Sequence, residues 1–108
     1  MRLTDLDPQW VRLTETGGRT RYEVTRATAD GILFACPTCY LKNAGLVGTH
    51  SILCWQPHVP PELKPGPGRW PFTGADFTDL TLTPSVHLPG ADGCQAHFFV
   101  RNGAIEMC

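Results

Sequence analysis

The chain has 108 residues, a common size for one domain around one hydrophobic core, and we predict a single domain over residues 1–108. Nine basic residues against ten acidic ones make the chain almost neutral, which disfavours a dedicated nucleic-acid-binding protein but leaves room for a small local basic patch. No apolar stretch approaches the ~20 residues of a membrane helix, which excludes a membrane-spanning protein of that type.

The start of the chain, MRLTDLDPQW, has no apolar run of signal-peptide length, so we expect a cytoplasmic protein. Thiols stay reduced in that compartment, where clustered cysteines more often bind metal than form disulfides. The five cysteines are also an odd number, which a closed set of disulfides would not leave.

The first half of the chain contains signals for one short helix and three strands. Asp7 and Pro8 can open a helix as N-cap and first helical residue. Apolar and polar residues alternate over 20–25, which predicts a half-buried strand. Asp30-Gly31 predicts a tight turn into an apolar strand over 32–35, and a further strand is expected at Ser51–Trp55.

The second half is expected to hold a long loop and a hairpin. Five prolines exclude regular structure over 57–68 (PHVPPELKPGPG), and the alternating strand over 80–83 should stop at Pro84. Two strands, 97–101 and 104–107, flank Asn102-Gly103, a dipeptide typical of the type I′ turn of a hairpin. Together these signals predict a mainly β domain with a C-terminal β-hairpin and a long Pro/Gly loop.

Two pairs of metal-binding residues share the same spacing. Cys36-Pro37-Thr38-Cys39 has the C-x-x-C spacing of a zinc knuckle, in which two thiolates on one tight turn chelate one ion. Cys94-Gln95-Ala96-His97 offers a second pair, and the two pairs make a Cys3His set, which is common in structural Zn²⁺ sites. A lone C-x-x-C can also be a redox motif, but such motifs usually open a helix in a βαβ unit. We predict Cys36, Cys39, Cys94 and His97 as zinc ligands.

The remaining cysteines and one histidine have other expected roles. In the predicted hairpin Cys108 lies opposite His97, close enough to be a substitute ligand. Cys54, beside Trp55 in an apolar strand, is expected in the core. His50 is a weak catalytic candidate: it can orient a ligand, act as a base beside a zinc ion with an open position, or be an ordinary loop histidine.

Three segments, CPTCYLKNAGLVGTHS, RWPFTGADFTDLTLTPSV and CQAHFFVRNG, together resemble a family of small zinc-binding proteins. The family occurs in tailed phages, prophages and bacterial operons, some of them beside ubiquitin-like conjugation genes. The resemblance covers roughly residues 30–104 and implies the same four ligands. Some members carry an ammonia monooxygenase label, but this chain has no recognisable copper site and no membrane span.

We therefore expect a structural zinc domain, a phage or prophage accessory protein that acts by binding an unidentified protein partner in the bacterial cytoplasm. A zinc-dependent hydrolase with His50 near an open metal site is the alternative. A nucleic-acid-binding zinc ribbon is a weaker one, given the near-zero net charge.

Overall fold

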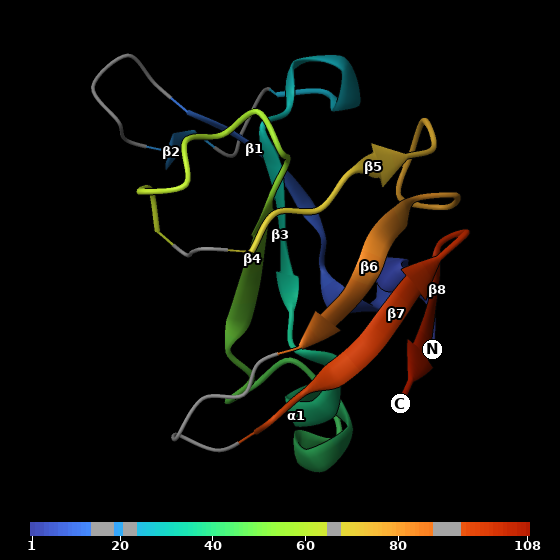
Figure 1. The fold of residues 1–108 in the computed structure, drawn as a ribbon. Coiled ribbons are helices and arrows are strands. Elements are labelled where there is room, and N and C mark those ends of the chain that lie inside the picture. The colour runs from blue at the N-terminus through green and yellow to red at the C-terminus, as the bar shows by residue number, and fades with distance from the viewer. Residues whose placement is uncertain (14–18, 21–23, 65–67, 88–93) are drawn as a thin grey trace.

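The computed structural model describes residues 1–13, 19–20, 24–64, 68–87 and 94–108, and it confirms a mainly β fold (Figure 1). These residues form two four-stranded antiparallel sheets with the strand orders β2-β1-β3-β4 and β5-β6-β7-β8. The strands of the first sheet are β1 (Gln9–Leu13), β2 (Arg19–Thr20), β3 (Gly31–Ala35) and β4 (Ser51–Trp55). Those of the second are β5 (Phe72–Thr73), β6 (Thr81–His87), β7 (His97–Arg101) and β8 (Ala104–Met107). The helical segments are η1 (Leu3–Leu6), η2 (Arg26–Thr28) and α1 (Pro37–Asn43).

The N-terminal segment differs from the predicted helix. Leu3 and Leu6 lie one 3-10 turn apart in η1, so both point inward and are fully buried. Asp7 ends this turn with a left-handed backbone, φ 50°, and the chain then runs extended into β1. The N-cap signal at Asp7-Pro8 was wrong because burial of the two leucines fixes the helical turn upstream of it.

The first sheet is centred on β3, whose side chains are buried or half-buried on both faces. Gly31 begins this strand beneath the Trp55 ring, where a Cβ atom would come within 2.7 Å of Trp55 Cε3 and 2.8 Å of the Cys54 carbonyl oxygen. The predicted strands at 32–35 and Ser51–Trp55 are both present and pair with each other. Of the strand expected over 20–25, residues 21–23 lie outside the described part, and Val24 and Thr25 are not in a strand.

The second sheet contains the predicted hairpin, with Phe98 opposite Met107 and Arg101 opposite Ala104. Asn102 and Gly103 have φ values of 49° and 75°, as a type I′ turn requires. Strand β6 does not stop at Pro84, as expected, but continues to His87. Its pairing with β7 is irregular between Leu82 and Val86, which accommodates a residue that has no N–H to donate.

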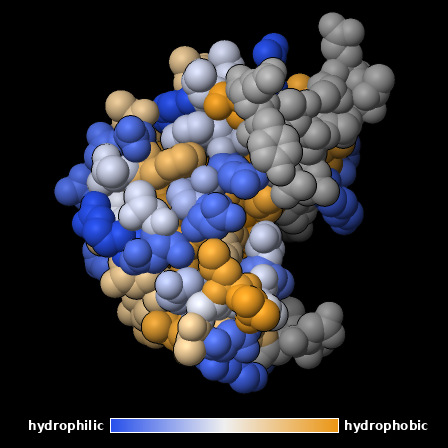
Figure 2. All heavy atoms as spheres, turned by 180° about the vertical axis from the view of Figure 1, so that it is seen from behind, coloured by the Kyte–Doolittle hydropathy of each residue, from blue (hydrophilic) through white to orange (hydrophobic). Residues whose placement is uncertain are grey.

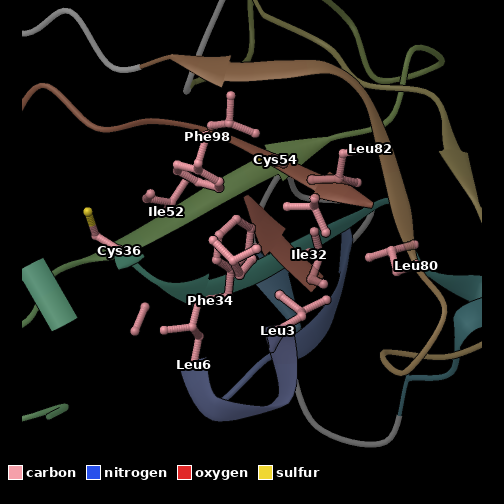
Figure 3. Close-up of a cluster of buried hydrophobic side chains, with 14 of the residues drawn as sticks. Leu3, Leu6, Ile32, Phe34, Cys36, Ile52, Cys54, Leu80, Leu82 and Phe98 are labelled. Carbon is pink, nitrogen blue, oxygen red and sulfur yellow. The ribbon is translucent and has the colours of Figure 1, made fainter. Parts of the chain in front are cut away.

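The main core lies between the two sheets (Figure 3). Its centre is an edge-to-face contact between Phe34 of β3 and Phe98 of β7, with ring centroids 6.0 Å apart. Cys54 is fully buried here, in agreement with its predicted packing role. Trp55 belongs to a second cluster on the other face of the first sheet, with Val59 from the loop that follows.

The Pro/Gly loop has no helix or strand in its described residues, 57–64 and 68. No helix in the described part of the chain is long and apolar enough to cross a bilayer. One face of the molecule shows small hydrophobic areas among hydrophilic side chains (Figure 2). The large apolar side chains exposed around α1 are Leu41, Leu46 and Val47.

Candidate functional site

Three of the predicted ligands meet at one point with a histidine that the sequence did not favour as a ligand. The ligand atoms of Cys36, Cys39, Cys94 and His50 all lie within 4.8 Å of one another. Cys36 follows β3, Cys39 lies in α1, His50 precedes β4 and Cys94 precedes β7. The cluster therefore joins the first sheet to the start of β7 in the second.

The local backbone explains how the first three ligands converge. Pro37 at the first helical position opens α1, so the C-x-x-C pair begins a helix instead of the expected tight turn. Residues 36 and 39 then lie one helical turn apart. The Cys36 N–H donates to the His50 carbonyl (2.8 Å), which brings the strand before the helix and the strand after it together at the cluster.

The spacing of the donor atoms suits a tetrahedral ion. Zn–S bonds of about 2.3 Å at the tetrahedral angle place two sulfurs about 3.8 Å apart. Cys36 Sγ and Cys94 Sγ are 3.7 Å apart, and His50 Nε2 is 3.3 Å from Cys94 Sγ. Three thiols and one imidazole also match a common closed zinc set, so the residues fit a metal ion of this kind.

The electrostatics of the thiols differ across the cluster. Burial raises the pKa of Cys36 to about 12, against an opposing hydrogen bond from the backbone of Cys39. For Cys94 burial also raises the pKa, but hydrogen bonds from the Ala96 backbone, His50 and the two other cysteines outweigh it and lower the pKa to about 7. The Cys94 thiol therefore loses its proton more easily than the Cys36 thiol and is more readily available as a thiolate ligand.

His97, the fourth ligand expected from the sequence, does not belong to this cluster. It is the first residue of β7, where its ring is exposed and stacks on His87, with centroids 4.5 Å apart. The matched C-x-x-H spacing was misleading because Gln95 has a left-handed backbone and Ala96 is buried, so the chain turns between Cys94 and His97. Cys108 lies opposite His97, as the register predicted, but is exposed and outside the cluster.

A second constellation lies on the outer face of the second sheet. Ser85 Oγ and His97 Nε2 are 3.0 Å apart, joining β6 to β7. His97 pairs directly with His87 across the two strands, and Ser85 lies two residues before His87 on the same face of β6. The irregular pairing of β6 at Leu82–Val86 spans Ser85, and such bulges are frequent beside active sites, where they re-aim a side chain.

The family comparison bears directly on this second constellation. The model of a family described as "Bacterial ubiquitination-like system serine protease (BubE)" matches residues 12–108. The chain belongs to the BubE family. The match agrees with the resemblance to proteins of bacterial operons, whereas occurrence in phages stays a prediction. The chain has no significant match among curated proteins or solved structures.

The BubE description directs attention to serine, a residue that the sequence analysis did not consider. The chain has two serines, Ser51 and Ser85, and four histidines. The Ser85–His97 pair could be predicted from the sequence only if β6 continued past Pro84, because only then does Ser85 face β7. His50 was noticed, but no spacing rule linked it to Cys36.

Proposed function

We propose that this BubE protein is a serine protease in which Ser85 is the nucleophile and His97 the general base. The observation that carries the proposal is the 3.0 Å contact between Ser85 Oγ and His97 Nε2. A serine hydroxyl is a weak nucleophile until an adjacent base accepts its proton, and this distance is within hydrogen-bond reach.

Elimination supports the choice of Ser85. The only other serine, Ser51, is exposed at the start of β4 and directly follows His50, which belongs to the metal cluster. Ser85 is half-buried, and its hydrogen-bonded imidazole is on the outer face of the sheet, where a polypeptide substrate can reach it. The pair therefore combines activation with access.

The chemistry follows the usual two steps of serine catalysis. Ser85 Oγ attacks the substrate carbonyl carbon while its proton moves to His97 Nε2, forming a tetrahedral intermediate. The C–N bond then breaks, and His97 returns the proton to the leaving amine, which leaves an ester on Ser85. Water, deprotonated by His97, hydrolyses that ester and restores the serine hydroxyl.

The metal cluster has a structural role in this proposal. Cys36, Cys39, His50 and Cys94 would hold a Zn²⁺ ion, which would fix the start of β7 three residues before His97. Four protein ligands complete a tetrahedral zinc site and leave no position for a reacting water. The alternative of a zinc hydrolase with His50 as its base loses support, because His50 is itself one of the four residues that could hold the ion.

The substrate class follows from the reaction and the family. A protease acts on a polypeptide, and the BubE description places the family in a bacterial ubiquitination-like system. We propose that the partner is a protein of such a system, bound as substrate. Leu41 in α1 and Leu46 and Val47 just after it are exposed apolar side chains, which are suited to contact with a protein surface.

A fluorophosphonate probe tests the nucleophile without knowledge of the substrate. Attack of Ser85 Oγ on phosphorus forms a P–O bond, expels fluoride and transfers the serine proton to His97. We expect intact-protein mass spectrometry to show one adduct per chain, mapped to Ser85. Ser85→Ala should abolish labelling and His97→Ala should slow it severely, whereas Ser51→Ala should label like the wild type. An unlabelled wild-type protein, or labelling that persists in Ser85→Ala, would refute the proposal.

A further inference from the structure

His87 contacts the face of the imidazole that would serve as general base. The rings of His87 and His97 lie at an interplanar angle of 27° with centroids 4.5 Å apart, which is a stacked arrangement. The two residues are direct cross-strand partners of β6 and β7, so the stack is built on a fixed backbone register. Neither the nucleophile nor the metal cluster requires His87.

The His97 ring needs such a support because most of its surroundings are solvent. Its side chain is exposed, and an exposed histidine on a strand samples several χ1 rotamers and a broad χ2 range. Its backbone is held, since the His97 carbonyl accepts a hydrogen bond from the Cys108 N–H (3.0 Å). Backbone order alone does not aim Nε2 at Ser85. A flat partner against the ring face restricts the rotation that would carry Nε2 away.

We propose that His87 is a positioning residue, which stacks on His97 and keeps its Nε2 directed at Ser85 Oγ. The proposal rests on the proposed function of Ser85 and His97. It assigns His87 no proton transfer, because the ring contact is face to face and not through a nitrogen. Any flat ring of similar size at residue 87 should therefore do the same.

The rate of fluorophosphonate labelling tests this role in the zinc-loaded protein. In His87→Ala we expect the labelling rate constant to fall by about tenfold, because a loosely held base is aligned for a smaller fraction of the time. His87→Phe keeps a flat ring and should restore the rate to near that of the wild type. His58→Ala removes another exposed histidine, one that pairs with Asp30 just before β3, and should leave the rate unchanged.

A readout that is independent of reactivity accompanies the rates. In NMR spectra the ring protons of His97 should shift in His87→Ala, because the ring current of the stacked partner is lost, while His87→Phe should retain an upfield shift. The melting temperatures of both variants should stay near that of the wild type, since residue 87 is on the surface.

The possible failures are distinguishable. Absence of wild-type labelling would refute the proposed function itself. Labelling that needs Ser85 and His97 but is equally fast in His87→Ala would refute only the role of His87. A His87→Phe variant as slow as His87→Ala would also refute it, because the imidazole and not the stack would then be required.

Discussion

Replacing His50 by alanine is expected to weaken zinc binding by about two to three powers of ten. Structural zinc binds small peptides with about 10–16 kcal/mol, so an equal share for each of four ligands is about 2.5–4 kcal/mol. His50 Nε2 is 3.3 Å from Cys94 Sγ, and the side chain is exposed. Its removal therefore takes away a ligand without leaving a cavity in the core.

The assay is zinc competition against a chromogenic chelator of known affinity, followed by the metal content of each protein after dialysis. His97→Ala is the matched control, since it removes the histidine of the C-x-x-H pair and should retain one zinc per chain with unchanged affinity. Loss of zinc in His97→Ala together with full retention in His50→Ala would show that the ligand assignment is incorrect.

Three further predictions concern stability. Cys54→Ser should keep full zinc stoichiometry but lower the free energy of unfolding by about 1–3 kcal/mol, because it buries a hydroxyl among apolar side chains. Loss of zinc in this variant would show that Cys54 is a ligand. Phe98→Ala should cost about 3–5 kcal/mol in denaturant unfolding, since it removes the ring that contacts Phe34 between the sheets; a cost below 1 kcal/mol would contradict that packing. The metal-free protein should lose stability as the pH rises above the ordinary thiol pKa of 9.0, because burial raises the pKa of Cys36 to about 12 and also raises that of Cys54, so both thiols ionise there only when unfolded. The pKa of Cys94 is lowered to about 7, which acts in the opposite direction but mainly below pH 9. Urea unfolding at pH 9 and at about pH 10.5 therefore checks the prediction, and equal or greater stability at the higher pH would contradict it.

The sequence predicts correctly those elements that are determined by residues close to one another in the chain. The hairpin around Asn102-Gly103 was predicted in its exact register, because the turn type and the alternation of side chains fix it together. The apolar strands β3 and β4 were predicted for a similar reason. Asp7-Pro8 misled because a capping signal is weak when burial of Leu3 and Leu6 selects another turn.

The candidate site was only partly accessible from the sequence because its residues meet through tertiary structure. Cys36, Cys39 and Cys94 were recognisable from their pairs, but His50 reaches them through the pairing of β3 with β4. The spacing of His97 from Cys94 suggested metal binding, whereas the structure places His97 in contact with Ser85. That contact requires β6 to continue through Pro84, whereas the rule that proline ends a strand predicts that β6 stops there.

The first residues of the chain complete the last hairpin, and this has a consequence for biosynthesis. The Leu3 N–H donates to the Gly103 carbonyl (2.8 Å), and the Ile105 N–H donates to the Met1 carbonyl (2.9 Å). Figure 1 shows the two ends of the chain close together at β8. On the ribosome, the first segment emerges before residues 103–105, so the backbone hydrogen bonds that join it to the hairpin can form only after those residues have left the exit tunnel. Contacts of such sequence separation form late and slowly, so this end of the second sheet closes late in folding.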